Sequence, residues 1–130
     1  MNEIQGLNKA SKMVFEDNKK KGFWDKERET GTLLMLIVSE VAETLEADRK
    51  DRFTNVPENV VWKEDWDIGE KSSDVTNFET YVKDTFEDEI ADTFIRLMDL
   101  CGARGIDIEW HIKQKLAYNR TRAKKHGKNY

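Results

Sequence analysis

The chain has 130 residues, 38% of them hydrophobic and 37% charged, and its formal net charge at pH 7 is −4. This length predicts a single domain over residues 1–130 with one hydrophobic core. The negative charge argues against a nucleic-acid polymer as a partner, because proteins that bind one usually present a basic field.

The apolar and cysteine content favours a cytoplasmic location. No apolar run approaches the roughly 20 residues of a membrane span, and the first residues lack the basic and apolar regions of a secretory signal, so we expect no membrane partner. The single cysteine, Cys101, lies on an apolar helix face and is expected to be a structural thiol in a reducing compartment.

Helical periodicity begins near the N-terminus. A first helix is predicted from Glu3 to about Lys20, with Gly22 as its stop signal. A short aromatic connection then leads to a second helix from Thr30 to about Lys50. The apolar run Leu33–Val38 covers every side of this helix, as expected of a helix that is buried on several faces.

Residues 53–82 interrupt the helical pattern with Pro57, Gly69 and several Ser and Asn residues. We interpret them as a long packing connection with room for one short helix. Because connections of this length are uncommon unless they are functional or mobile, a lid or a subunit contact is the alternative.

Two further helices follow. The third is predicted over about Lys83–Ala103, and the fourth starts at the N-cap residue Asp107. No proline interrupts any of the four helices and no strand pattern is evident, so the class is all-α. The third helix has an apolar face and an opposite polar edge; the face is Phe86, Ile90, Phe94, Leu97 and Cys101, and the edge is Glu89, Asp92, Arg96 and Asp99.

Two acidic pairs at helical spacing are the candidate functional residues: Glu40 with Glu43, and Glu89 with Asp92. With 26 acidic residues in 130, chance alone places about five acidic pairs three residues apart. The first pair is distinctive because Glu40 lies on an apolar stripe, where an unpaired charge is costly to bury. The second pair lies on another amphipathic helix of similar build.

Four carboxylates converging from two packed helices would form a divalent-metal site. Oxygen ligands favour Mg²⁺, with Mn²⁺ as a substitute, and Mg²⁺ commonly serves phosphate chemistry. A di-iron site requires Glu-x-x-His pairs, and neither His111 nor His126 completes one. A catalytic zinc site lacks its His and Cys ligands.

A polar stripe on the fourth helix could bind the phosphates and sugar of a substrate, because Arg and Lys favour phosphate. The alternative for this stripe is a solvated basic end that complements the helix dipole. Trp24 could stack on a base, or it could be a packing anchor. The residues of the stripe are Lys115, Asn119, Arg122 and His126.

The ordered combination of these motifs resembles the MazG-like, all-α nucleoside triphosphate pyrophosphohydrolase superfamily over residues 22–128. The resemblance rests on four segments: Gly22–Asp25, Ser39–Glu43, Asp88–Asp92 and Lys115–Arg120. It implies a fold like a four-helix bundle, here with a longer connection between its second and third helices than compact members have.

The resemblance also implies an activity. Glu40, Glu43, Glu89 and Asp92 would bind Mg²⁺, Lys115 and Asn119 would contact the nucleotide, and Trp24 would touch its base. The reaction would release pyrophosphate and a nucleoside monophosphate, through a water held by the carboxylates or the metal. Our hypothesis for the general base is Glu43.

Similar proteins are dimers or tetramers, and the limited apolar content suits a domain that shares its core with another subunit. We therefore expect a homodimer or homotetramer. Two other functions stay open: a catalytically silent helical oligomerisation or regulatory module of the same fold, and hydrolysis of phosphoribosyl-ATP.

Overall fold

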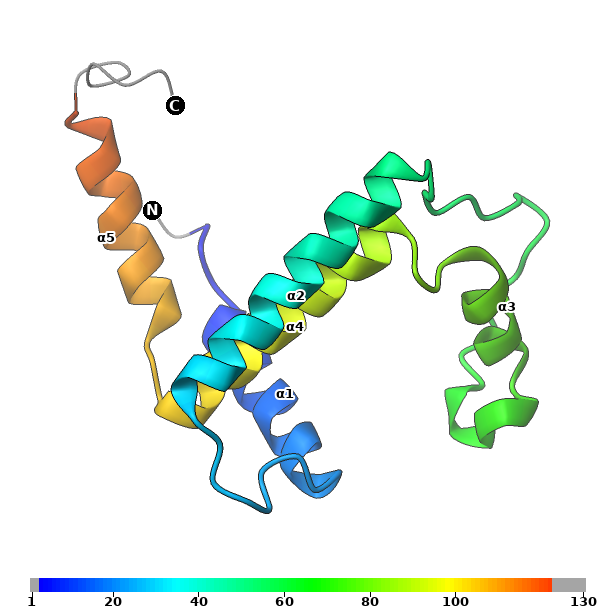
Figure 1. The fold of residues 1–130 in the computed structure, drawn as a ribbon, viewed down its shortest axis with the longest axis horizontal. Coiled ribbons are helices and arrows are strands. Elements are labelled where there is room, and N and C mark those ends of the chain that lie inside the picture. Colours follow the sequence, from blue (N-terminus) through cyan, green and yellow to red (C-terminus); the bar gives the residue numbers. More distant parts are fainter. Residues whose placement is uncertain (1–2, 123–130) are drawn as a thin grey trace. The chain divides into compact units, whose positions relative to one another are not determined.

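The computed structural model describes residues 3–122, and the regular secondary structure among these residues is helical, without any strand. The predicted all-α class is therefore confirmed. None of the described helices is both long enough and apolar enough to cross a membrane. The helices in chain order (Figure 1) are α1 (Leu7–Lys20), α2 (Thr30–Arg49), the 3-10 helix η1 (Trp66–Lys71), α3 (Ser73–Tyr81), α4 (Phe86–Arg104) and α5 (Ile108–Arg120).

The chain divides into two compact units. Residues 28–96 form the central unit, which holds α2, η1, α3 and the first half of α4. The described residues of the terminal unit are 3–27 and 97–122, and they include α1, the end of α4 and α5. The organisation of the whole chain as one domain stays a prediction.

Two predicted helix starts are too early, and a residue with positive φ explains each one. Gly6 has φ 88°, so α1 begins at Leu7. Asp84 has φ 64°, so α4 begins at Phe86. This backbone conformation cannot continue a right-handed helix. The predicted start of α2 at Thr30 and the N-cap at Asp107, whose side chain accepts the N–H of Trp110, are confirmed.

Residues 53–82 contain two short helices, η1 and α3, where one was expected. Two carboxylates hold this segment. Asp65 accepts the backbone N–H groups of Ser73 and Asp74, at 2.9 and 3.1 Å. Asp74 is fully buried and accepts the N–H groups of Lys63 and Asp65. This segment is held by hydrogen bonds from side chains to the backbone rather than by a periodic apolar face. The hydrophobic pattern of the sequence therefore does not reveal these helices.

The terminal unit is organised by α1, which packs against α5. The side-chain amide of Asn8 donates to Asp107 at 2.8 Å, and the N–H of Leu7 donates to Glu109 at 3.2 Å. Cys101 is half-buried beside α1 and lines a cavity of about 400 Å³. Burial raises the pKa of its thiol, which favours the unreactive form.

Few apolar side chains are buried by this chain alone. Ile37 and Ala47 are the buried hydrophobic residues among those described. The expectation that α2 is buried on several faces is wrong for the single chain, because much of its apolar surface has no cover. The large apolar side chains of α2 that are 46 to 63% exposed are Leu34, Met35, Val38, Val41 and Leu45.

The first half of α4 shows the same pattern. On its predicted apolar face, Phe94 is 58% exposed and Ile90 is 38% exposed. On its polar edge, Glu89 is buried. Within one chain, therefore, α4 turns acidic side chains toward α2 and leaves apolar side chains uncovered.

Candidate metal centre

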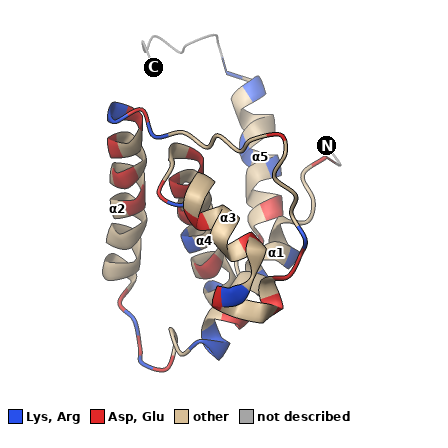
Figure 2. Cartoon of the chain, turned by 90° about the vertical axis from the view of Figure 1, so that its right-hand side faces the viewer, with Lys and Arg blue, Asp and Glu red and all other residues tan. Residues whose placement is uncertain are grey.

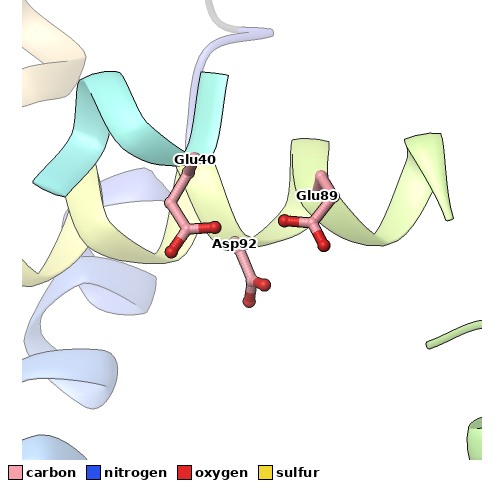
Figure 3. Close-up of side chains that lie close together, drawn as sticks. All are labelled: Glu40, Glu89 and Asp92. Atoms are coloured by element: carbon pink, nitrogen blue, oxygen red, sulfur yellow. The ribbon is translucent and has the colours of Figure 1, made fainter. Parts of the chain in front are cut away.

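Three of the four predicted metal ligands meet within the central unit. Glu40 comes from α2, and Glu89 and Asp92 come from α4. Each offers one carboxylate oxygen, and these oxygens all lie within 4.8 Å of one another. Figure 3 shows the three carboxylates close together, and Figure 2 shows the acidic residues along α2 and α4. The i, i+3 spacing places Glu89 and Asp92 on one face of α4.

Two of these carboxylates are buried, and each has one oxygen without a hydrogen-bond partner. Glu40 is 7% exposed and Glu89 is 6% exposed. One oxygen of Glu40 accepts a hydrogen bond from Arg96 Nε at 2.8 Å. The other oxygen of Glu40, Oε2, has no hydrogen-bond partner, and neither has Glu89 Oε2.

Unpartnered buried carboxylate oxygens are unfavourable, because each has lost its hydration without gaining a donor. A hard divalent cation would restore that interaction. These carboxylates could therefore hold a hard divalent cation.

The pKa values of the three acids diverge. Burial disfavours ionisation of Glu40, but the hydrogen bond of Arg96, the neighbouring Glu43 and the charge of Arg96 together outweigh it, so the pKa of Glu40 lies below its usual range. Burial, followed by the neighbouring Glu43 and Glu40, raises the pKa of Glu89 to about 8. Burial and the charges of Asp88 and Glu40 also raise the pKa of Asp92. Without a cation, this site therefore holds Glu89 in its protonated form at neutral pH.

Glu43 lies at the edge of the group. It is exposed, and it is not one of the three residues whose oxygens all lie within 4.8 Å. It is still close enough to contribute to the raised pKa of Glu89. Its role as a ligand or as a base stays a prediction.

The predicted substrate-binding residues belong to the terminal unit. Trp24 donates its indole N–H to Asp99 at 3.0 Å and packs edge-to-face against Phe15. The cations of Lys115, on α5, and of Arg122, two residues beyond its end, lie 5.4 and 5.6 Å from the centroid of the Tyr118 ring. The last helical turn also carries Asn119, which is exposed. His126, the fourth residue of the predicted stripe, lies outside the described residues.

The contact between Arg96 and Glu40 was missed by sequence reasoning. Arg96 follows Asp92 by four residues and Glu89 by seven, so its place on the acidic edge of α4 could be read from the spacing. Its contact with Glu40 on α2 could not be read from the spacing, because the two residues lie on different helices. Arg96 neutralises one buried carboxylate in the absence of metal.

Arg96→Gln is expected to change stability and metal affinity in opposite directions. Loss of the charged hydrogen bond to Glu40 should lower the free energy of unfolding by about 1–3 kcal/mol without metal. Loss of the competing cation should strengthen Mn²⁺ binding severalfold. Denaturant unfolding and calorimetric Mn²⁺ titration measure the two effects. A parallel fall in both quantities would instead make Arg96 a residue that positions Glu40.

The stability of the metal-free protein is expected to fall as the pH rises from about 4.5 to about 8, because only the unfolded chain releases the proton of Glu89 in this range. Glu89→Gln should remove this contribution and raise the unfolding temperature near pH 8. Saturating Mg²⁺ should also remove it, because metal binding displaces the proton. Thermal unfolding across this pH range, with a chelator present, tests the effect. An unfolding temperature that falls equally with pH in the wild type and in Glu89→Gln would contradict it.

Comparisons with protein families, with curated proteins and with solved structures found no match to this chain. Membership of the MazG-like superfamily therefore stays a prediction. Its basis is the four sequence segments described above.

Proposed function

We propose that this chain is a Mg²⁺-dependent nucleoside triphosphate pyrophosphohydrolase of the MazG-like, all-α type. Its substrate would be an ordinary or modified (d)NTP, and its products a nucleoside monophosphate and pyrophosphate. Such an activity would serve to cleanse the nucleotide pool. The observation that supports the proposal is the pair of buried, unpartnered carboxylate oxygens on Glu40 and Glu89 in a group completed by Asp92.

Glu40, Glu89 and Asp92 would hold the cation, with Glu43 beside them. When bound, Mg²⁺ supplies charge neutralisation and polarisation of the phosphoryl group under attack. The lowered pKa of Glu40 keeps this ligand ionised at neutral pH, while Glu89 must release a proton before it can bind a cation.

The proposed reaction is hydrolysis between the α and β phosphates. The oxygen of a water molecule forms a bond to the α-phosphorus, the bond from that phosphorus to the bridging oxygen breaks, and pyrophosphate leaves with the electron pair. A carboxylate accepts the proton of the attacking water. We assign this role to Glu43, because its side chain is exposed to solvent, and we assign the orientation of the water to Glu40.

The nucleotide itself would be bound by residues of the terminal unit. Lys115 and Arg122 offer cations for phosphate oxygens, and Asn119 offers an amide for the sugar or a phosphate. Trp24 offers a ring face to the base, since its indole N–H is already donated to Asp99.

A second copy of this chain is the proposed cover for the uncovered apolar faces. Val38 and Val41 are each 52% exposed on α2, and Phe94 is 58% exposed on α4. A monomer rarely leaves so many large apolar side chains in water. We therefore propose a homodimer or homotetramer whose subunits share this core. Light scattering of the purified chain measures its mass.

The decisive experiment measures pyrophosphate release from a panel of ordinary and modified (d)NTPs, with phosphoribosyl-ATP included, in the presence of Mg²⁺ or Mn²⁺. We expect equal amounts of pyrophosphate and nucleoside monophosphate from at least one (d)NTP. Turnover of phosphoribosyl-ATP alone would assign the substrate to the third possibility. If no compound is turned over at any metal concentration, the chain is the catalytically silent oligomerisation or regulatory module.

A further inference from the structure

A cavity of about 400 Å³ lies within the terminal unit, between α1 and the turn that joins α4 to α5. Its volume is within the usual range for sites that bind small organic molecules. None of the residues that we propose to bind the metal or the nucleotide lines this cavity. It is therefore a candidate site for a separate ligand. Its walls include Ser11, Lys12 and Phe15 of α1, Cys101 of α4, and Ile106 and Asp107 of the turn.

The buried part of the lining is apolar apart from one hydroxyl group. Ser11 is 2% exposed, and its Oγ has no hydrogen-bond partner. A buried hydroxyl group without a partner is unfavourable. Phe15 and Cys101, which are half-buried, contribute apolar surface to the same walls. This part of the cavity suits a ligand with an apolar body and one atom that can form a hydrogen bond with Ser11.

The exposed part of the lining carries two opposite charges. Lys12 is exposed and forms no ion pair within residues 3–122. Asp107 is also exposed, and the two donors to its side chain, the Asn8 amide and the Trp110 N–H, both bond to Oδ1. The hydrogen bond from Asn8, followed by that from Trp110, lowers the pKa of Asp107. A cation and an anion can therefore both contact a ligand at neutral pH.

These two charges match a ligand that carries both signs. A ligand with a single charge would lie near one group of like charge, which weakens binding. Glu16, the third charged residue of the lining, already pairs with Lys19 at 3.6 Å. An α-amino acid offers a carboxylate for Lys12 and an ammonium group for Asp107, and its side chain can then enter the cavity.

We propose that this cavity binds a free amino acid with an aromatic side chain that has one hydrogen-bonding atom, such as the indole N–H of tryptophan. Lys12 and Asp107 bind the charged groups, the ring packs against Phe15 and Ile106, and Ser11 Oγ accepts the N–H of the ring. This binding does not depend on the proposed function, because it involves neither the metal site nor the nucleotide.

The first test is a calorimetric titration of the full chain with tryptophan, without metal or nucleotide. We expect saturable binding of one molecule per chain. Tryptamine lacks the carboxylate and indole-3-propionate lacks the ammonium group, so each should bind at least about tenfold more weakly. Lys12→Gln should weaken the binding of tryptophan about tenfold and leave that of tryptamine unchanged. Lys9→Gln, which removes an exposed charge of α1 outside the lining, should keep the wild-type affinity.

Alkylation of Cys101 tests where the amino acid binds. Cys101 is the single cysteine of the chain, so its reaction with iodoacetamide reports on this cavity. Burial raises the pKa of its thiol, so the reaction is followed above neutral pH. Saturating tryptophan should slow the reaction severalfold. The same concentration of indole-3-propionate should slow it less.

Water that bonds to Ser11 is the alternative occupant, and Ser11→Ala separates the two. This variant should weaken the binding of tryptophan severalfold and leave that of phenylalanine unchanged, because the phenylalanine ring has no hydrogen-bonding atom. Equal effects on both amino acids would overturn the contact with Ser11.

The other outcomes are equally decisive. No binding of tryptophan, or binding that leaves the alkylation of Cys101 unchanged, would overturn the site in favour of a water-filled cavity. Binding of tryptamine or indole-3-propionate as tight as that of tryptophan would overturn the assignment to an amino acid. Equal losses of affinity in Lys9→Gln and Lys12→Gln would overturn the contact with Lys12 in favour of a general charge effect. Binding of tryptophan by a chain that hydrolyses no nucleotide would support this site and refute only the proposed activity.

Discussion

Replacing Glu40 with Gln is expected to lower the rate of pyrophosphate release at least about 100-fold. Residues that only support a ligand change metal affinity or activity by 10–100-fold, so loss of a ligand should cost more. Glu40 is the carboxylate of the group whose pKa is lowered, by Arg96 against the effect of burial. A neutral amide binds a hard cation more weakly than a carboxylate does.

Glu46→Gln is the matched control for this variant. Glu46 lies on the same helix, is exposed, and pairs with Lys50 at 3.0 Å. It should keep the wild-type rate. Circular dichroism of both variants shows whether the helices are retained, and a higher Mg²⁺ concentration should partly restore Glu40→Gln. A folded Glu40→Gln protein with the wild-type rate would refute the metal site.

Replacing Gly102 with Ala is expected to destabilise the terminal unit by roughly 1–3 kcal/mol, the usual cost of overpacking. A Cβ atom on Gly102 would lie 2.4 Å from the carbonyl oxygen of Ser11 and 2.7 Å from the Cβ of Phe15. Both atoms are fixed by the backbone of α1, so the two helices must move apart. Helix propensity alone predicts the opposite sign, since Ala is favoured over Gly by about 1 kcal/mol.

Gly31→Ala separates these two effects. Gly31 lies in α2, and a Cβ atom there would meet nothing within 4 Å. This variant should be neutral or stabilised by up to about 1 kcal/mol. Denaturant unfolding compares the two variants with the wild type. Equal stabilisation of both would show that α1 does not lie against Gly102 in solution.

The acidic centre shows how much of a candidate site can be predicted from the spacing of residues in the sequence. The i, i+3 pairs and the apolar setting of Glu40 single out Glu40, Glu43, Glu89 and Asp92 in the sequence. The structure brings oxygens of three of them, all but Glu43, within 4.8 Å of one another. Arg96 was not assigned, because ordinary surface bases have the same spacing. Its significance depends on which carboxylates of other helices lie within a few ångströms.

The sequence by itself determined that the protein is helical, and it located the end of α1 near Gly22 and the N-cap of α5 at Asp107. These features depend on local chemistry: backbone freedom at glycine and a side-chain oxygen that caps a helix. The tertiary structure decided that α2 meets the acidic edge of α4 and that two carboxylate oxygens are buried without partners. Periodicity defines the faces of a helix, but which face is covered depends on residues distant in the chain.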